Sequence, residues 1–224
     1  MNHTLAFLHT SPVHVSTFDA LLSELAPDIP VRHVVDESLL SEACSVGEVT
    51  PALRKRVEET LLSMEKKGAT VVVCTCSTIG AVVEELNGNT SATMLRIDRP
   101  MAREAVAHGS RIVVAATLAT TLVPTRELIA SAARQAHKQV EIIDLLCEKA
   151  WSYFEQGNQQ AYLQEIAHQV EDAASLGDVI VLAQVSMARA SEFYANLPVP
   201  VLNSPRSGLL AAIQAYREKH STGI

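Results

Sequence analysis

The sequence predicts an α/β protein built from two pseudo-symmetric parallel-sheet lobes, that is, duplicated Rossmann-like halves with a cleft between them. Short apolar runs alternate with amphipathic helical patterns along the 224 residues, which is typical of βαβ units. The run 71–73 consists of three valines without a polar interruption, as expected for a strand buried on both faces. The order of elements then repeats at an offset of about 108 residues.

In the first half, the strands are expected at residues 5–8, 31–35, 70–73 and 94–97, and the helices through residues 18–25 and at about 37–43, 51–67 and 81–86. Pro27 and Pro30 end the first helix. Residues 45–49 are expected to form a loop, and Thr50 and Pro51 are suited to the N-cap and first turn of the long helix. Gly68 is suited to end it.

In the second half, the strands are expected at residues 111–115, 140–143, 178–182 and 199–202, and the helices at 122–135, 147–154, 158–174, after Ser186, and at 208–219. Asp144 is expected to end its strand, and residues 98–100 and 203–205 to connect the halves. The first lobe would then comprise residues 1–98 with 206–224, and the second residues 99–205.

The repeat predicts where a ligand binds. Residues 34–36 match 142–144, and 70–73 match 178–181. Ligands of parallel α/β folds bind outside the carboxyl ends of the strands. If the halves face each other, we expect Cys76 on one wall of the cleft and its counterpart, Gln184, on the other.

Composition excludes several classes of function. A formal net charge of −7 argues against a partner that is nucleic acid or an anionic membrane. No apolar run reaches membrane-spanning length and no signal-peptide pattern begins the chain, so a cytoplasmic protein is expected. The four cysteines suggest neither a disulfide framework nor a metal site. No G-x-G-x-x-G follows a predicted strand, which disfavours a dinucleotide cofactor.

The turn after residues 71–73 carries a thiol and two hydroxyls, Cys76, Ser77 and Thr78, where a strand ends and a helix begins. Backbone N–H groups at a helix start can hold an anion and lower the pKa of a thiol. We therefore expect Cys76 to be either a reactive thiol or a small structural residue. Cys74 continues the apolar strand and is expected in the core.

These residues resemble a family. The segment Thr75-Cys76-Ser77-Thr78, the segment from Ala116 to Thr120 and the duplicated halves resemble the aspartate/glutamate racemase superfamily, which also contains hydantoin racemase, maleate isomerase and arylmalonate decarboxylase. The resemblance covers nearly the whole chain. It implies a cofactor-free enzyme that acts on a small-molecule carboxylate, with two cysteines, one per half, working on opposite faces of an α-carbon. We also expect a homo-oligomer, a dimer.

The chain departs from this pattern in its second half. The family's second motif reads Gly-Cys-Thr followed by Glu or His, whereas this chain has Ala183-Gln184-Val185-Ser186. An amide transfers no catalytic proton, and racemisation by two bases needs an acid or base on each face. Ser186, His9 and Cys147 are candidate substitutes, although a structural role is open for each of them.

Hydroxyls at the other strand ends are candidates for carboxylate binding. Thr10 and Ser11 follow the first strand, and Thr117, Thr120 and Thr121 its repeat. Helix capping needs the same residue types, so both roles stay open. Asp36 and Asp144 are interpreted as structural or mouth-lining, and Trp151, Tyr153 and Phe154 as a packing cluster. With Cys76 as the catalytic residue, the expected substrate-binding set is His9, Thr10, Ser77, Thr78, Thr117, Thr120, Gln184, Val185 and Ser186.

The sequence therefore predicts a cofactor-independent enzyme of the racemase/isomerase type, acting at the carbon next to a carboxylate of an amino acid or related small acid. A single thiol suits one-sided chemistry better than racemisation, so a decarboxylase or a cis–trans isomerase is an alternative. A non-catalytic carboxylate-binding protein is the third possibility.

Overall fold

The computed structural model describes residues 3–221, and the chain divides into two compact units. One unit holds the described residues up to Asp98 together with those from Pro205 onward, and the other holds Arg99–Ser204. Each unit is a four-stranded parallel sheet with helices on both faces. The prediction of two parallel-sheet α/β halves is confirmed.

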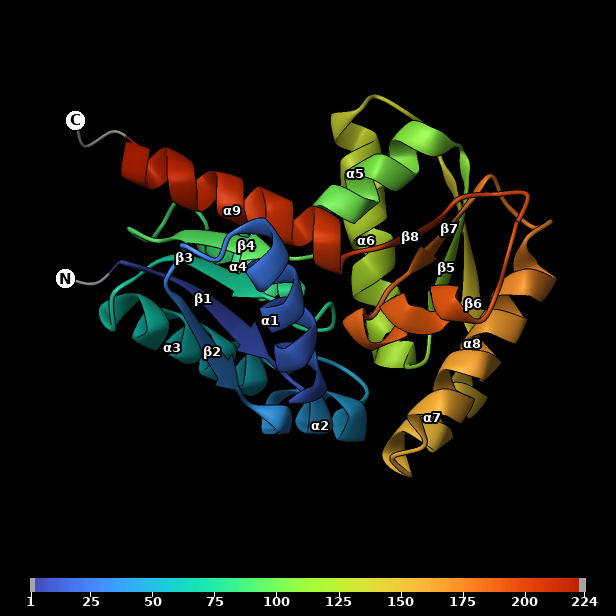
Figure 1. Cartoon of the computed structure of the whole chain (residues 1–224), viewed down its shortest axis with the longest axis horizontal. Helices are drawn as coiled ribbons and strands as arrows, with labels where there is room; N and C mark the ends of the chain where they lie inside the picture. The colour runs from blue at the N-terminus through green and yellow to red at the C-terminus, as the bar shows by residue number, and fades with distance from the viewer. Residues whose placement is uncertain (1–2, 222–224) are drawn as a thin grey trace. The chain divides into compact units, whose positions relative to one another are not determined.

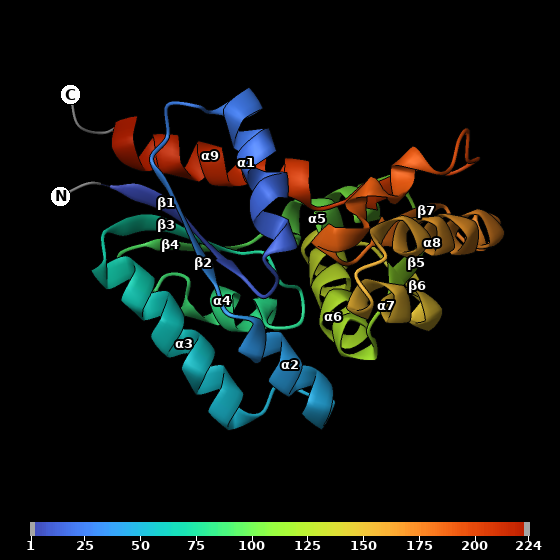
Figure 2. The ribbon, with the colours of Figure 1, turned by 60° about the horizontal axis from the view of Figure 1, so that its bottom comes forward.

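In the first unit, the strand order is β2-β1-β3-β4. Its strands are β1 (Thr4–His9), β2 (Val31–Val35), β3 (Ala69–Cys74) and β4 (Thr93–Arg96). Its helices are α1 (Val13–Leu25), α2 (Glu37–Val46), α3 (Pro51–Lys66), α4 (Gly80–Leu86) and α9 (Pro205–Ser221). Figure 2 shows α1 and α9 on one face of this sheet and α2, α3 and α4 on the other.

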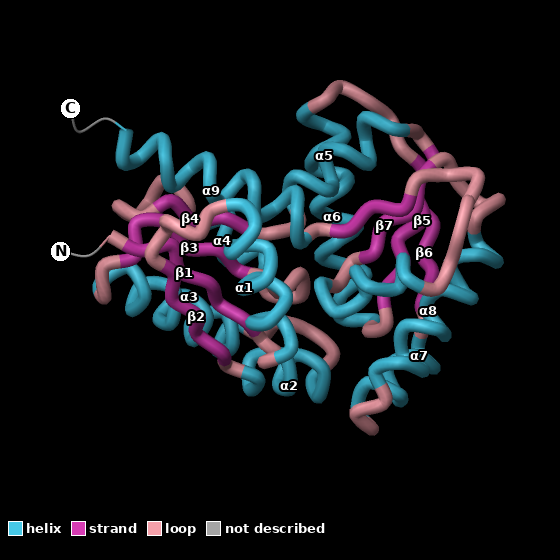
Figure 3. The backbone as a smooth tube through the Cα atoms, viewed as in Figure 1, coloured by secondary structure: helices cyan, strands magenta, loops and turns pink. Residues whose placement is uncertain are grey.

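In the second unit, the strand order is β6-β5-β7-β8, the same sequence of neighbours as in the first. Its strands are β5 (Arg111–Ala116), β6 (Glu141–Leu146), β7 (Val179–Leu182) and β8 (Val201–Asn203). Helices α5 (Arg99–His108) and α6 (Ala119–Gln135) cover one face, and α7 (Glu148–Glu155), α8 (Gln159–Ala173) and the 3₁₀ helix η1 (Val185–Glu192) cover the other. The magenta strands of Figure 3 show the two sheets.

Side-chain alternation along β1 explains the first core. Ala6 and Leu8 point into the cluster formed with α2, α3 and α4, whereas Phe7 stacks on Phe18 of α1 on the other face. Leu8 pairs in register with both Val34 and Cys74. The carboxyl ends of three neighbouring strands therefore lie together at one edge of the sheet.

Helix α3 begins and ends as its sequence predicts. The Thr50 hydroxyl accepts a hydrogen bond from the Leu53 N–H at 3.2 Å, and Pro51 occupies the first turn. Gly68 follows the helix with a φ of +96°, a conformation that glycine adopts without strain. Arg32 of β2 donates to the last carbonyl groups of the helix, those of Met64 and Lys67, at 2.9 and 3.1 Å.

Some predicted boundaries are wrong. The connection is expected over residues 98–100 and no element before residue 111, whereas residues 99–108 form helix α5. Proline is tolerated in a first helical turn, and Met101, Ala102, Ala105 and Val106 bury one face of this helix. Asp144 does not end its strand, since β6 continues to Leu146. The helix α2 extends over Ser45 and Val46, and the segment after Gln184 is a 3₁₀ helix.

No described helix combines the length and the apolar character that crossing a membrane requires.

Candidate active site

Cys76 lies immediately beyond β3, in the turn that leads into α4 (Figure 1), and is 7% exposed. Burial raises the pKa of its thiol, while hydrogen bonds from the Thr10 hydroxyl and from the backbone and side chain of Thr78 oppose that rise. The backbone N–H of Ile79 acts in the same direction. The expectation of a lowered pKa is therefore wrong, because desolvation outweighs these donors. At neutral pH, Cys76 is a protonated thiol.

The Thr10 hydroxyl is placed against this turn. Its oxygen is buried and makes no hydrogen bond of ordinary geometry, although it lies close enough to the sulfur to favour the thiolate. Helix α1 has no side-chain cap at its start, so Thr10 does not serve the capping role that was open for it. Because buried hydroxyl groups are normally hydrogen-bonded, the Thr10 hydroxyl is suited to bind a further oxygen or sulfur atom in addition to the Cys76 sulfur.

A buried ion pair anchors the Cys76 turn. Arg96 binds Asp98 through two hydrogen bonds, of 2.7 and 3.0 Å. Burial disfavours the Asp98 carboxylate, but Arg96 and the Ser77 hydroxyl hold its pKa below the usual range. Gly80 is packed on the guanidinium group, since a Cβ there would lie 2.9 Å from Arg96 Cζ. The pair therefore fixes both Ser77 and the start of α4.

His9 ends β1 and is fully buried. Its Nδ1 lies 2.8 Å from Thr75 Oγ1, and its Nε2 lies 2.8 Å from His33 Nδ1. Burial, followed by the nearby rings of His14 and His33, lowers its pKa to about 3. His9 is therefore neutral at physiological pH, and both ring nitrogens are engaged within the protein.

In the second unit, the side chain of Gln184 accepts two hydrogen bonds from Thr117. Its Oε1 accepts from the backbone N–H of Thr117 at 2.6 Å and from the Thr117 hydroxyl at 2.9 Å. Helix α6 has no side-chain cap at its start, so Thr117 is not a capping residue. Thr120 is partly exposed in the first turn of that helix. An amide oxygen thus fills a position that could accept a carboxylate oxygen equally well.

The sequence left three groups open as substitutes for the second thiol, and His9 is described above. Ser186 lies 2.7 Å from the Tyr162 hydroxyl, whose pKa is raised by burial to about 12. Cys147 is fully buried at the start of α7, and burial, with a contribution from Glu165, raises its pKa to about 12. Val185 is buried beside them. Neither His9 nor Cys147 has a pKa near neutrality, where an acid/base catalyst works best.

Several structural interpretations are confirmed. Cys74 is fully buried in the core, and burial raises the pKa of its thiol. Asp36 is the N-cap of α2 and accepts from the Ser38 N–H at 3.1 Å. Trp151 stacks on Phe154 with ring centroids 4.8 Å apart. Asp144 accepts from Arg126 at 2.7 Å.

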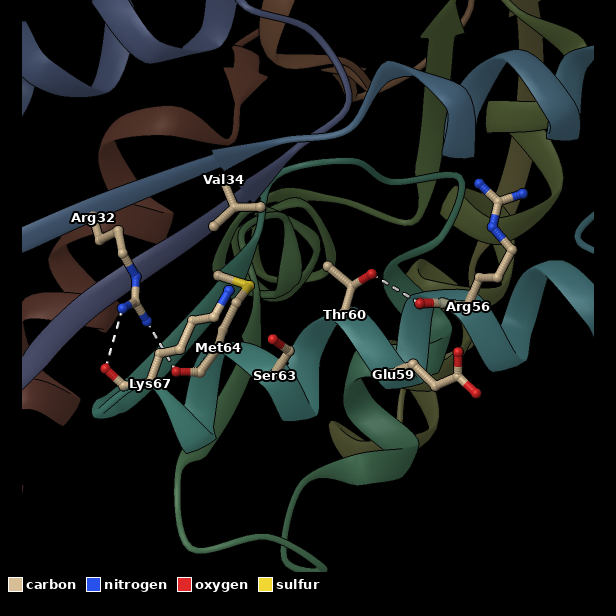
Figure 4. Close-up of a pocket in the computed structure, with 8 residues that line it drawn as sticks. All are labelled: Arg32, Val34, Arg56, Glu59, Thr60, Ser63, Met64 and Lys67. Carbon is tan, nitrogen blue, oxygen red and sulfur yellow. Dashed lines mark hydrogen bonds between the residues drawn. The ribbon is translucent and has the colours of Figure 1, made fainter.

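Two hollows of the first unit lie apart from Cys76. One, of about 360 Å³, lies between β2 and α3 (Figure 4), and Arg32, Val34, Arg56, Glu59, Thr60, Ser63, Met64 and Lys67 line it. In that view, Arg32 and Thr60 already donate to backbone carbonyl groups. The other, of about 450 Å³, lies at the amino ends of β1 and β3, near His3 and Ala69. Neither includes a strand's carboxyl end.

Within residues 3–221, no group of three or more His, Cys, Asp or Glu side chains could hold a metal ion.

The sequence reasoning missed Arg96 and Asp98, and also Thr75, His14 and His33. The available signal was Asp98 directly after a strand, and four of the eight histidines within the first 33 residues. Arg96, Thr75 and His33 come to the same edge of the sheet through the parallel register of its four strands, and His14 comes from helix α1. Spacing along the chain does not reveal such a register.

Comparisons with known proteins agree with this architecture. Residues 15–212 match the family model described as Asp/Glu/Hydantoin racemase. A comparison with curated proteins gave no match.

Among solved structures, a glutamate racemase isoform from Bacillus anthracis is similar, with a TM-score of 0.73 and 14% identity over 99% of this chain and 83% of that one. The aspartate racemase of Picrophilus torridus gives 0.70 and 16%, over 99% of this chain and 100% of that one. An arylmalonate decarboxylase gives 0.58 and 15%, over 98% and 94%. At these identities, the likeness shows the fold.

Proposed function

Because the chain belongs to the Asp/Glu/hydantoin racemase family, we propose that it is a cofactor-independent enzyme that transfers a proton at the carbon next to a carboxylate. The substrate class is an amino acid or a related small acid. Cys76 is the acid/base residue. The observation that supports this role is a buried thiol at the carboxyl end of β3, with the hydroxyls of Thr10 and Thr78 and the backbone N–H groups of Thr78 and Ile79 turned to its sulfur.

Burial and these donors together allow Cys76 to exist both as a neutral thiol and as a thiolate. Burial favours the neutral thiol, while the four donors stabilise the thiolate that remains after the proton has left. A group balanced in this way can give a proton to a carbanion and take it back, as general acid/base catalysis requires. The Arg96–Asp98 pair holds the turn in place through Ser77, so the sulfur keeps its position during the transfer.

We assign carboxylate binding in the second unit to Thr117 and Thr120. The N–H and O–H groups of Thr117 now donate to the amide oxygen of Gln184. A substrate carboxylate oxygen is a stronger acceptor than an amide oxygen and would replace it. Loss of one donor of this kind typically costs about 10²–10³ in rate.

A second candidate reaction is decarboxylation, and Gln184 is the observation that favours it. Gln184 stands where the family pattern has a second thiol, and it does not titrate. In decarboxylation, the bond between the α-carbon and a carboxylate breaks, CO₂ leaves, and the electron pair stays on the α-carbon. That carbon then takes the proton of the Cys76 S–H group. This sequence needs only one protonated thiol, the form that burial favours.

Proton exchange in D₂O tests the proposal. NMR would follow deuterium uptake into aspartate, glutamate and an arylmalonate with the wild type, Cys76→Ala and Cys44→Ala. Cys44 is a partly buried thiol on α2 and serves as the matched control. We expect Cys76→Ala to lose about 10²-fold or more of the exchange rate, and Cys44→Ala to retain it.

The stereochemistry of the product separates the two candidate reactions. Exchange with inversion identifies a racemase, whereas retention, or exchange only with loss of CO₂, identifies one-sided chemistry. Exchange that persists at the wild-type rate in Cys76→Ala contradicts the role of the thiol. If the acids shift the melting temperature and none of them exchanges, the chain is a carboxylate-binding protein.

A further inference from the structure

A continuous row of polar groups crosses the first unit, from its surface to the edge of the sheet that carries Cys76. It begins at Asp19 of α1, whose side chain is 60% exposed, and continues at His33 of β2, which is 16% exposed. It ends among buried groups, His9, Thr75 and His14. Such a gradient from solvent to interior is unusual for side chains that serve packing alone, because burying imidazoles is costly unless they are hydrogen-bonded.

Every neighbouring pair in the row is close enough to pass a proton. The Asp19 carboxylate lies 3.2 Å from His33 Nε2, although not in the alignment of a full hydrogen bond. His33 Nδ1 and His9 Nε2 are 2.8 Å apart, and His9 Nδ1 and Thr75 Oγ1 are also 2.8 Å apart. Thr75 Oγ1 makes a longer contact of 3.4 Å with His14 Nδ1.

The surrounding rings hold the imidazoles in this alignment. His33 stacks on His9 at 5.1 Å and on Phe7 at 5.3 Å between ring centroids. Phe18 of α1 packs against His9 at 5.8 Å. Because the rings are fixed, a proton can change nitrogen only by transfer along the hydrogen bonds.

We propose that Asp19, His33, His9, Thr75 and His14 form a proton relay between solvent and the carboxyl end of β3, next to Cys76. This relay connects solvent with the edge of the sheet that carries Cys76, within the same unit. The inference rests on the proposed function, because a relay at this edge matters only if a proton is transferred there. His33, His9 and Thr75 act through their neighbours and are positioning residues.

The protons of the row can take two arrangements, and each contact between neighbouring groups holds one proton in both. The Thr75 hydroxyl lies 3.2 Å from the Leu8 carbonyl oxygen and 2.8 Å from His9 Nδ1, and the relay uses the shorter contact. In the resting arrangement, His33 Nε2–H points to Asp19, His9 Nε2–H donates to His33 Nδ1, the Thr75 hydroxyl donates to His9 Nδ1, and His14 Nδ1–H donates to Thr75 Oγ1. When a proton binds His14 Nε2, the last three of these protons each move one step outward, and the proton on His33 Nε2 stays in place. One N–H or O–H bond breaks as the next one forms, and the last proton arrives on His33 Nδ1.

The second arrangement places the positive charge at the surface. His33 becomes an imidazolium beside the Asp19 carboxylate, while His9 and His14 are neutral in both arrangements. Neutrality suits their environment, because burial lowers the pKa of His9 to about 3 and of His14 to about 4. The charged groups facing the row are Asp19 from α1 and His33 from β2. Helix α9 packs on the same face, and its Arg206 is held by Glu24.

NMR of histidine nitrogens tests the relay without a substrate. Protein labelled with ¹⁵N-histidine would be titrated from pH 8 to pH 5 by two-bond ¹H–¹⁵N correlation. As the pH falls, we expect His9 to change from the Nε2–H to the Nδ1–H tautomer. His33→Phe preserves the ring contacts but has no nitrogens, so the His9 tautomer should then stay constant. His168→Gln, on exposed α8, should behave as the wild type.

Either of two results would overturn the relay. One is a His9 tautomer that stays the same from pH 8 to pH 5, and the other is a His9 tautomer that changes in the same way in His33→Phe. Both results are independent of whether the protein catalyses any reaction.

Kinetics then connect the relay to catalysis. Thr75→Val removes the hydroxyl with nearly the same shape, whereas Thr75→Ser keeps it. We expect Thr75→Val to lower kcat for Cys76-dependent exchange about tenfold without raising KM, and millimolar imidazole to restore part of the loss. Thr75→Ser should stay within twofold of the wild type. Equal losses in the two variants, or no loss in either, would contradict the relay. A tautomer change without any Cys76-dependent exchange would instead leave the relay standing and reject the proposed function.

Discussion

In both units, a polar side chain at the end of the first strand contacts one that follows the third strand, but the side chains differ between the units. In the first unit, His9 at the end of β1 contacts Thr75 in the turn after β3. In the second, Thr117 after β5 contacts Gln184 after β7. The strand orders β2-β1-β3-β4 and β6-β5-β7-β8 correspond element by element. The fold therefore determines where these groups meet, and the side chains determine whether a proton can move there.

The difference in side chains is a difference in titratable groups. The first unit holds the Cys76 thiol at its strand ends and, beside it in the turn, Thr75, from which contacts run through three imidazoles to the Asp19 carboxylate. The second holds an amide, hydroxyls and a phenol with a pKa raised to about 12 by burial. On the proposed function, the first unit would transfer the proton and the second would bind the carboxylate. This asymmetry explains why a duplicated fold need not carry duplicated chemistry.

The largest expected effect comes from making the second turn resemble the first. Gln184→Cys restores the second thiol that the family pattern has, and frees the N–H and O–H groups of Thr117 to stabilise a thiolate. We expect inversion at the α-carbon to rise about 10²-fold or more, measured by chiral chromatography of aspartate and glutamate.

Two further variants serve as controls for that substitution. Gln184→Ala frees the same donors without adding a thiol, and should not gain inversion. The double variant with Cys76→Ala should lose it again. An increase that survives without Cys76 would show that the second turn works alone, and the comparison between the units would fail.

The place of Cys76 in the fold was predictable from the sequence, but its electrostatics were not. Uninterrupted β-branched residues indicated the buried strand before Cys76, and the polar turn after it followed directly. The pKa of Cys76 was predicted in the wrong direction because burial depends on helices distant in the sequence. Helix α5 was missed because Pro100 is compatible with either a turn or a first helical turn. The histidine row was missed because its members are 24 and 66 residues apart in sequence.

Acid should destabilise the first unit selectively. Burial lowers the pKa of His9 to about 3 and of His14 to about 4, whereas in the unfolded chain both take up a proton near pH 6.5. The folded state therefore has its full stability above pH 6.5 and loses it as the pH falls. By pH 5, we expect a loss of about 2 kcal/mol for each histidine.

Hydrogen exchange read by mass spectrometry can locate this loss. After correction for intrinsic rates, peptides from β1 and β3 should lose protection between pH 7 and pH 5, while peptides from β5 and β7 keep theirs. His14→Gln should reduce the pH dependence by about half, and His168→Gln, on exposed α8, should not change it. An equal loss of protection in both units would contradict the assignment.

The smallest expected effect concerns the polar pair in the second unit. Tyr162→Phe removes the hydroxyl that lies 2.7 Å from Ser186, so we expect a loss of about 1 kcal/mol in unfolding free energy, measured in urea. Tyr194→Phe removes a hydroxyl that packs against the same hydrophobic cluster and is the matched control. Burial raises the pKa of Tyr162 to about 12, so this phenol has little tendency to exchange protons at neutral pH, and kcat should stay within twofold of the wild type. A tenfold fall in kcat with an altered pH profile would instead identify Tyr162 and Ser186 as the second acid/base, and both units would then transfer protons.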